Sequence, residues 1–460
     1  MATIAFGAPG IDRFHLHERL ARELRQDGHA VTALAVDPIA HTFWRRQSVD
    51  SALVEVGAPD PMRAPIAEFA EREGRRLGAA RSARAARRHR RRCERLLAGL
   101  APGLLRWFEA ERPALLLLHQ RRSAAQALLQ FVARETGTRV LWTGDGLLPH
   151  TLQFDECGLD GDAAIRRRRA GDYRVVRNEP SLLAACLATT LGRTTPSALT
   201  RREVKRPTLE ARLACVPAAL RRHGRRGLPL APRGGGRARA PAPPVSGAAA
   251  SLPSAPFVTL LLQDADDPRV RLDADAPPSH RELIAAAARA AAAIDPELVL
   301  VVVVPPRGVA HAGLLGLSAA VRLHFVGPDA AADAAVAGLA TLTINHPLAS
   351  VALLAGTPVV HTGAALYGLP GVTTQAPTAD LDAGLRRALE RDHATLRQRF
   401  LSWLFGYGHL WCASDWPDHN GLAGLVQAIT RRLGERRPEG LRLRYRAGPA
   451  WPLAADGRGS

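Results

Sequence analysis

The sequence predicts an α/β protein with two domains, each built around a parallel sheet. Three observations support this prediction. The chain has 460 residues, too many for one ordinary hydrophobic core and suited to two domains of roughly 200 residues. Short apolar runs alternate with stretches of helical period in both halves, as in a sheet flanked by helices. A segment rich in Pro, Gly and Arg separates the halves. Together these features indicate two doubly wound, Rossmann-type domains.

The first domain is expected over residues 1–220. Its predicted strands and helices are 3–6, 14–27, 31–36, 81–111, 114–118, 124–136 and 139–143. Gly28 ends the first helix, because glycine is the usual residue just beyond a helix C-terminus. In such sheets ligands bind beyond the carboxyl ends of the strands. The loops after Phe6, Leu118 and Thr143 are therefore expected to surround one cleft.

The second domain is expected over residues 257–438. Its predicted elements are 257–262, 281–294, 297–304, 322–326, 341–344, 349–356 and 358–361. Between the domains, residues 221–256 are expected to form a linker or a disordered loop, since a Pro/Gly/Arg-rich stretch cannot build a core. Residues 439–460 are expected to be a frayed tail.

The basic residues behind the net charge of +19 are almost all arginines, and some of these arginines gather in two clusters. The clusters are Arg81, Arg84, Arg87, Arg88, Arg90, Arg91, Arg92 and Arg95, and Arg221, Arg222, Arg225, Arg226, Arg233, Arg237 and Arg239. Neither is interleaved with aromatic residues that stack on bases, so we expect no nucleic-acid partner. The first cluster is typical of a solvated helix face. Contact with anionic lipid or a polyanionic sugar is the alternative.

Cysteine usage and hydropathy indicate a cytoplasmic protein. The five cysteines are scattered and form no C-x-x-C pair, so neither a disulfide framework nor a structural zinc site is expected. The first residues do not have the pattern of a secretion signal. The strongest apolar run, 298–304, is much shorter than the roughly 20 residues that span a bilayer. Any association with the inner membrane is therefore expected to be peripheral.

The segment Asn345–Val360 is the sharpest local motif. A polar strand end leads directly into a helix, and the free N–H groups at a helix start suit a phosphate. The segment is similar to the N-S-T-x-G-x-x-A-L-x-x-G-x-P-V pattern of the capsule polysaccharide biosynthesis and export family, which includes the Kps-type β-Kdo transferases of bacterial group 2 capsules.

Three further segments resemble motifs of the same family, in the same order along the chain. Gly363–Thr373 is similar to G-x-A-x-Y-x-x-P-G-L-T, and Leu261–Asp267 resembles L-Q-x-x-x-D. Asp145–Pro149, followed by Thr151, Asp155 and Gly158–Gly161, resembles E-G-Y-L-R-P…T-L-E-x-x-G-V-N-G. The resemblance thus covers most of the chain outside the 221–256 segment.

This resemblance implies a GT-B-like architecture, with an acceptor-side first domain and a nucleotide-sugar-binding second domain facing across a cleft. It further implies transfer of Kdo or a related sugar from a CMP-sugar to a lipid or glycolipid acceptor, with retention and without a metal or cofactor. Retention needs a carboxylate near the anomeric carbon. The expected catalytic residues are Asp155 and Asp145, and the expected substrate-binding residues are Gln263, Asp267, Arg307, Asn345, His346 and His119.

The chain also departs from the family pattern. Val303-Val304-Pro305-Pro306 stands where a basic K-H-H-P run is usual, and His346-Pro347 replaces Ser-Thr. Two usual glutamates are the shorter Asp145 and Asp155, which moves a carboxylate by more than about 1 Å, and such a misplacement can cost about 10²-fold in rate. His346 or Arg307 is a candidate to restore the missing charge. A catalytically inactive homologue, acting as a scaffold in a capsule synthesis or export complex, is the alternative function.

Overall fold

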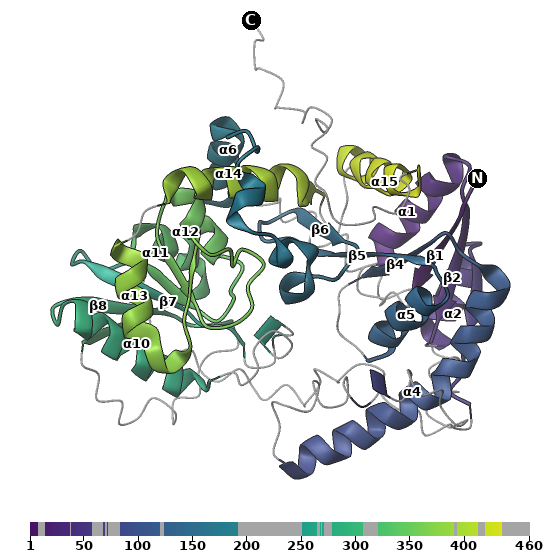
Figure 1. Ribbon diagram of the computed structural model, residues 1–460, viewed down its shortest axis with the longest axis horizontal. Coiled ribbons are helices and arrows are strands. Elements are labelled where there is room, and N and C mark those ends of the chain that lie inside the picture. Colours follow the sequence, from purple (N-terminus) through teal and green to yellow (C-terminus); the bar gives the residue numbers. More distant parts are fainter. Residues whose placement is uncertain are drawn as a thin grey trace, which may run out of the picture.

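Two sheets carry the fold, one for each half of the chain (Figure 1). The computed structural model describes residues 1–7, 14–36, 38–57, 68–69, 71, 83–119, 124–191, 251–264, 267, 269–270, 278–306, 321–390, 393–412 and 419–434. Most of the expected linker, the expected tail and Arg307 lie outside these residues. Within them, no helix combines the length and the apolar character needed to cross a bilayer.

The first sheet has seven strands in the order β13-β6-β5-β4-β1-β2-β3. Five are parallel: β1 (Thr3–Gly7), β2 (Ala30–Ala35), β3 (Asp50–Leu53), β4 (Leu115–His119) and β5 (Arg139–Asp145). The antiparallel strands β6 (Thr151–Asp155) and β13 (His409–Trp411) extend one edge. The order 3-2-1-4-5 of the parallel strands is that of a doubly wound sheet, so the Rossmann-type prediction is confirmed for this half.

Helices cover both faces of the first sheet. They are α1 (Phe14–Gln26), α2 (Pro38–Arg46), α4 (Ala83–Glu111), α5 (Ala124–Glu135) and α15 (His419–Gly434). Alternate residues of a strand point to opposite faces. Ile4 and Phe6 therefore pack with α1, α2 and α15, whereas Ala5 packs with α4 and α5.

The second sheet has six parallel strands in the order β12-β11-β10-β7-β8-β9. They are β7 (Phe257–Leu261), β8 (Val299–Val303), β9 (Arg322–Val326), β10 (Thr341–Thr343), β11 (Val359–His361) and β12 (Thr374–Gln375). Helices α10 (His280–Ile294) and α13 (Leu381–Glu390) cover one face, and α11 (Ala331–Ala337) and α12 (Ala349–Ala355) the other. The strand order is again doubly wound, which confirms the prediction of two Rossmann-type domains.

In the described part of the chain, two passages between the sheets lie outside the range 221–256 that the sequence predicts for the linker. After β6, a crossover segment of residues 156–179 leads into α6 (Pro180–Leu191), and both pack on the second domain beside α14 (Ala394–Tyr407). β13 and α15, inside the predicted range 257–438, return to the first sheet. The reason for the return is physical. β13 pairs with β6, which would otherwise end the sheet, and α15 buries an apolar stripe that includes Leu422, Leu425 and Ile429.

His409 joins the two halves at the start of β13. Its Nε2 accepts a hydrogen bond from the Leu147 N–H at 3.1 Å, and its Nδ1 lies 3.0 Å from the Leu404 carbonyl oxygen. An imidazole that accepts at one nitrogen and donates at the other is neutral. Burial lowers the pKa of His409 to about 4. The site also needs Gly146, where a Cβ would collide with Thr151 and His409.

Acid is expected to weaken this connection. The folded pKa of about 4 lies below the ordinary value of 6.5, so the unfolded state binds a proton that the folded state does not as the pH falls from 7 to 5. Stability is therefore lost over this range, by about 2 kcal/mol for one such histidine. His409→Gln keeps a donor and an acceptor but does not titrate. Urea unfolding at pH 7 and pH 5 is expected to show a smaller acid loss for this variant; an equal loss would contradict the assignment.

Candidate functional site

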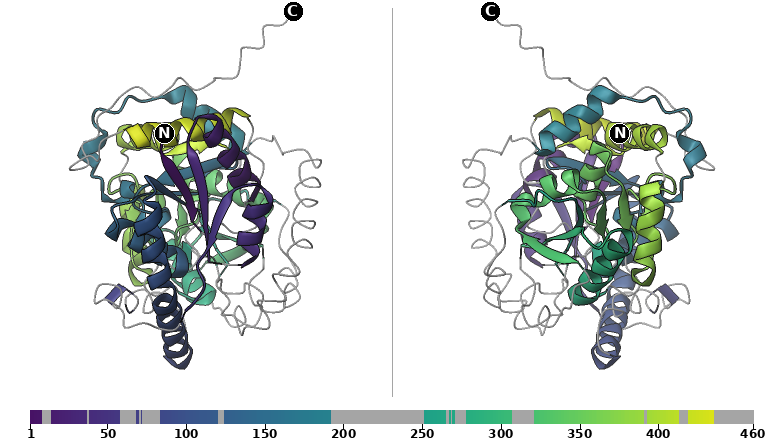
Figure 2. Two further views of the ribbon diagram at one scale, coloured as in Figure 1. Left: turned by 90° about the vertical axis from the view of Figure 1, so that its right-hand side faces the viewer. Right: turned by 90° about the vertical axis from the view of Figure 1, so that its left-hand side faces the viewer.

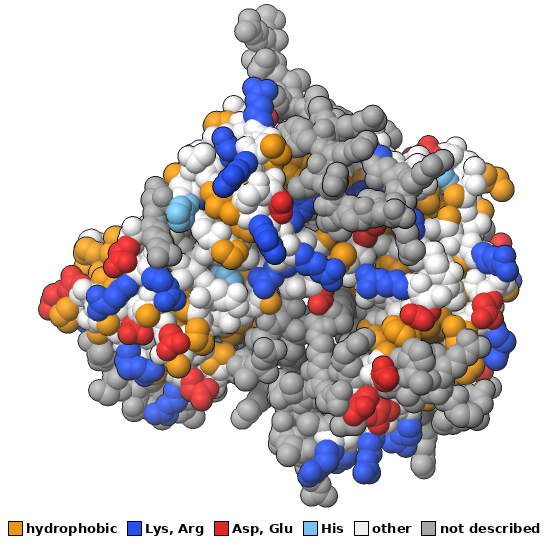
Figure 3. Space-filling view, viewed as in Figure 1, with side chains coloured by type: hydrophobic (Ala, Val, Ile, Leu, Met, Phe, Trp, Pro, Cys, Tyr) orange, Lys and Arg blue, Asp and Glu red, His pale blue; other side chains and the backbone are white. Residues whose placement is uncertain are grey.

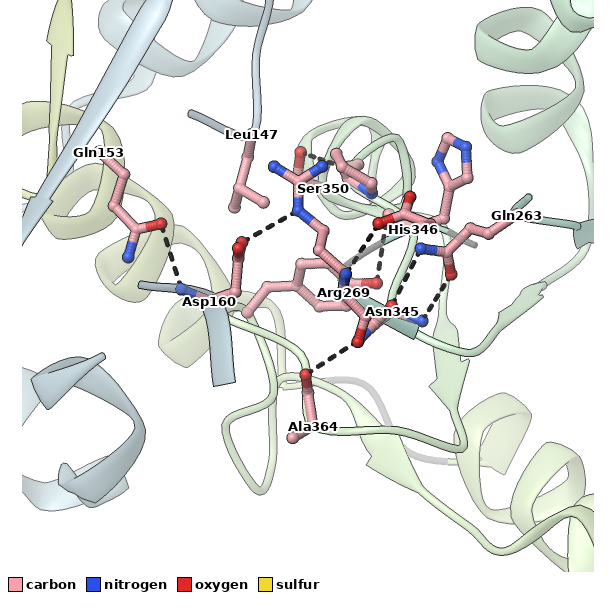
Figure 4. A network of polar contacts seen from close by, with 12 residues as sticks. Leu147, Gln153, Asp160, Gln263, Arg269, Asn345, His346, Ser350 and Ala364 are labelled. Atoms are coloured by element: carbon pink, nitrogen blue, oxygen red, sulfur yellow. Dashed lines mark hydrogen bonds and ion pairs between the residues drawn. The ribbon is translucent and has the colours of Figure 1, made fainter. Parts of the chain in front are cut away.

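The carboxyl ends of β7 and β10 lie side by side at the centre of the second sheet. The chain leaves these two strands toward opposite edges, so this is the topological switch point at which doubly wound sheets bind ligands. Gln263 follows β7 and Asn345 follows β10. Gln263 Nε2 donates to Asn345 Oδ1 at 3.0 Å, and the Asn345 N–H donates to Gln263 Oε1 at 3.1 Å. The structure thus brings these two expected residues together in a buried pair (Figure 4).

Arg269 is the charged centre of the site, although it lies outside every motif in the sequence. Its backbone carbonyl accepts a hydrogen bond from Asn345 Nδ2 at 3.1 Å, and its backbone N–H donates to Asp267 Oδ1 at 2.8 Å. Its Nε lies 3.0 Å from Asp160 Oδ1 in an ion pair. Burial alone would lower the pKa of Arg269, but Asp160, Asp267 and Asp145 more than offset it and raise the pKa above its usual range.

Asp160 is the residue of the crossover segment that contacts the Arg269 guanidinium. Its N–H donates to Gln153 Oε1 of β6 at 3.4 Å, while its carboxylate meets Arg269. Polar contacts therefore run without a break from the first sheet to Asn345 (Figure 4). Asp160 has φ +52°, the left-handed region that few residues other than glycine adopt. Such strain persists where the surrounding structure enforces it, often at functional sites.

Arg166 makes a second contact between the crossover segment and the motif at Gly363–Thr373. Its Nη1 donates to the Ala365 carbonyl oxygen at 2.8 Å. Gly368 permits this approach, because a Cβ there would stand 2.7 Å from Arg166 Nη1 and 2.9 Å from His361 Cε1. Gly368, at a variable position of the motif, thus leaves room for Arg166 from the crossover segment and for His361 of the second domain.

His346 is a neutral donor. Its Nδ1 accepts the Leu348 N–H at 3.1 Å, which leaves the proton on Nε2. Burial and, to a lesser extent, the nearby Arg269 lower the pKa of His346 to about 4. The ring points away from the Asp160–Arg269 pair in Figure 4. His346 therefore does not supply the positive charge for which the sequence made it a candidate.

The start of α12 differs from the expected phosphate cradle. The N–H groups of Ala349, Ser350 and Val351 donate to the carbonyl oxygens of residues 346, 347 and 348, each at 3.0 Å. The His346 N–H donates to Thr343 Oγ1, and Pro347 has none. Over residues 346–351 every backbone donor thus has an acceptor within the turn, because the chain tightens before the helix begins.

Asp155 and Asp145 do not converge. β6 runs antiparallel to β5, and Asp155 pairs with Trp142 while Asp145 pairs with Leu152, which separates the two along the ladder by about 10 Å. Asp155 Oδ1 accepts the N–H groups of Cys157 and Gly158 at 2.6 and 3.1 Å, and Oδ2 accepts that of Ala164 at 2.9 Å. Burial raises the pKa of Asp155 against these bonds. Its carboxylate thus fixes the start of the crossover segment.

His119 lies at the switch point of the first sheet, between β4 and β1. Thr143 Oγ1 donates to the Leu118 carbonyl oxygen at 3.3 Å and lies 3.0 Å from His119 Nδ1. The ring of His17 packs edge-on against His119 with 5.0 Å between centroids. Of the expected site residues that the structure describes, Asp145, Asp155 and His119 thus belong to the first sheet, and Gln263, Asp267, Asn345 and His346 lie beyond strand ends of the second.

Comparison with known proteins yields no matching family model and no matching curated protein. Among solved structures, the chain is similar to the glycotransferase of kitacinnamycin, with 16% identity, a TM-score of 0.35 and coverage of 94% of this chain and 99% of that one. A putative UDP-N-acetylglucosamine 2-epimerase from Listeria monocytogenes has 10% identity, a TM-score of 0.34 and coverage of 95% and 99%. Thermosulfurimonas dismutans KpsC, a beta Kdo 2,4 transferase, has 17% identity, a TM-score of 0.36 and coverage of 69% and 88%. At these scores the architecture rests on strand order and register.

The Asp160–Arg269 ion pair is expected to couple the two halves. Asp160→Asn keeps the size of the side chain and tolerates the left-handed backbone, but leaves Arg269 with less compensation, at a cost of about 1–3 kcal/mol. Arg269→Gln should cost a similar amount, and the double variant less than the sum of both. Urea unfolding of the four proteins measures the coupling energy. Strict additivity would show that the pair contributes nothing to stability.

Proposed function

We propose that the protein is a glycosyltransferase of capsular polysaccharide biosynthesis that transfers Kdo, or a related sugar, from a CMP-sugar to a lipid or glycolipid acceptor with retention. The observation that carries the proposal is the polar chain Gln153–Asp160–Arg269–Asn345, which joins two Rossmann-type sheets at the edge where such sheets bind nucleotides. The proposal also draws on the four sequence motifs, since three of them supply residues to this site: Asp160, Gln263 and Asn345.

The second domain is proposed to bind the donor. Arg269 is its cation: Asp160 occupies Nε, and the terminal nitrogens have no hydrogen-bond partner among the described residues. A guanidinium in this state pairs well with a phosphate or a carboxylate. The neutral His346 is proposed to donate from Nε2 to an uncharged acceptor on the donor. Gln263 and Asn345 hold the two strand ends together and fix the Arg269 backbone.

Asp145 is proposed as the carboxylate that faces the anomeric carbon. It is the last residue of β5, at the carboxyl edge of the first sheet, and its charge acts on Arg269 across the domain boundary. Asp155 is proposed to act indirectly, because its oxygens bind three backbone N–H groups of the segment that carries Asp160. His119, at the same sheet edge, is proposed to contact the acceptor.

Two observations favour the alternative, an inactive homologue that acts as a scaffold in a capsule synthesis or export complex. The backbone donors before α12 are used within the turn, and both oxygens of Asp155 are engaged by backbone. A scaffold of this kind would keep the interdomain contacts and bind no donor, or would bind a donor without turnover.

Donor binding is expected to protect the protein from thermal unfolding, with a larger effect for CMP than for UMP or GMP. A nucleotide at 100 times its dissociation constant adds about 2.7 kcal/mol. Asn345→Ala is expected to remove the protection, because it breaks the pairing with Gln263 and frees the Arg269 backbone. Asn178→Ala is the matched control, since Asn178 is an amide on the crossover segment that bonds Gln398. No shift with any cytidine nucleotide would contradict the donor assignment.

Turnover distinguishes an enzyme from a scaffold. Incubation with CMP-Kdo and a lipid acceptor is expected to give product, and Asp145→Asn to lower the rate about 100-fold or more with little change in thermal midpoint. Asp155→Asn is expected to lower the midpoint as well, because it weakens three hydrogen bonds. Wild-type protein that binds CMP but forms no product would favour the scaffold. Equal rates for Asp145→Asn and wild type would exclude Asp145 as the carboxylate.

A further inference from the structure

The crossover segment presents a strip of arginines at the surface. Residues 166–177 include six arginines and one acidic residue, Asp172. Arg167, Arg169, Arg174, Val175 and Arg177, here called the basic strip, are exposed, whereas Tyr173 and Val176 between them are buried. The inner side of the segment packs along α14, where Tyr173 meets Phe400 and Trp403. In the space-filling view, arginines cross the region where Figure 1 draws this segment (Figure 3).

Arg168 adds a positive charge that makes no direct ion pair with any of the described residues. Its guanidinium carbon lies 4.3 Å from the ring centroid of Trp403, in a cation–π contact. Its Nε and Nη1 are buried and have no hydrogen-bond partner among the described residues. Leaving such donors unmatched is costly. The Arg168 guanidinium therefore adds to the positive electrostatic potential of the basic strip, which strengthens its attraction to an anionic surface.

Apolar surface adjoins the strip. Val175 is 73% exposed between Arg174 and Arg177. The next helix, α6, has the sequence PSLLAACLATTL without a charged residue. Its leucines pack against the core, and its exposed residues are the small Pro180, Ser181, Ala184, Ala185 and Ala188. A basic strip beside an uncharged apolar helix suits the interface of an anionic bilayer, where arginines meet headgroups and apolar side chains enter the acyl boundary. A soluble polyanion would be recognised by the charges alone.

The arginines of α4 form a different surface. Arg87, Arg88, Arg91 and Arg95 are exposed on its amino-terminal half, which projects from the molecule on the side opposite α6 (Figure 2). Side chains of one sign around an exposed turn are typical of a solvated helix face. The projecting half of α4 and the strip beside α6 therefore cannot both lie flat on one membrane.

We propose that the basic strip and α6 dock the protein on an anionic lipid bilayer. This inference extends the proposed function, since it gives the lipid acceptor a surface from which to reach the site. The same segment that carries the strip carries Asp160, which contacts Arg269. Docking through the strip therefore holds the interdomain site close to the headgroups.

Sedimentation of the full chain with vesicles tests the proposal. Binding is expected to phosphatidylcholine vesicles that contain phosphatidylglycerol, and not to phosphatidylcholine alone. Each arginine near an anionic surface contributes about fivefold to partitioning, so Arg174→Gln/Arg177→Gln is expected to lower binding about 25-fold. Val175→Ser is expected to lower it about threefold, and unlike the arginine effect this loss should persist at high salt. Arg87→Gln/Arg88→Gln on α4 is the matched control and should bind as wild type does.

Three results would overturn the proposal. The first is absence of vesicle binding. The second is loss of binding in the α4 variant while the Arg174→Gln/Arg177→Gln variant still binds, and the third is complete displacement of the protein from vesicles by dextran sulfate together with no effect of Val175→Ser. Protection by CMP is measured on the same variants. Protection by CMP without vesicle binding would contradict only the proposed docking surface. Vesicle binding without protection by CMP would contradict only the proposed donor site.

Discussion

The structure depends on the Asp155 carboxylate, which gathers three backbone N–H groups at the point where the chain leaves the first sheet. A buried carboxylate is stable when hydrogen bonds replace its lost hydration. Here those bonds also set the path of the crossover segment. From this anchor the chain turns through Asp160 in a left-handed conformation and then places Arg166 against the second domain. Both interdomain contacts of the site thus lie downstream of one local interaction at the end of β6.

Burial of Arg269 at the switch point shows why the two domains need each other. A guanidinium out of water is costly unless carboxylates and hydrogen bonds accompany it, and its only ion-pair partner among the described residues, Asp160, comes from the crossover segment. His409 adds a neutral connection, and Gly146 and Gly368 make room for the approach. The second domain is therefore complete only with residues that precede it in the chain, while β13 and α15 complete the first.

The sequence was sufficient for the architecture, because hydrophobic period and turn residues are local signals that both sheets confirm. It also indicated Gln263 and Asn345, which stand at strand ends. It was not sufficient for the crossings: β13 has three residues, and its pairing with β6 is a contact between residues about 260 positions apart. The antiparallel register that separates Asp145 from Asp155 is likewise non-local. Arg269 was missed because its importance comes from Asp160 and Asp145, although it stands only two residues after the motif that ends at Asp267.

The balance of charges at the site determines whether the protein can bind an anionic donor, and so whether it can be active. At the described site one guanidinium faces Asp145, Asp160 and Asp267, and His346 is neutral. Carboxylates therefore outnumber cations, and a donor with both a phosphate and a sugar carboxylate would be repelled unless its anionic groups reach Arg269 directly. An ion pair at Nε restricts the guanidinium to end-on contact through its terminal nitrogens. That geometry favours a single anionic group at Arg269. The side of the site near Asp145 then suits the part of a ligand that gains positive charge. An anomeric carbon gains such charge when its bond to the leaving group breaks.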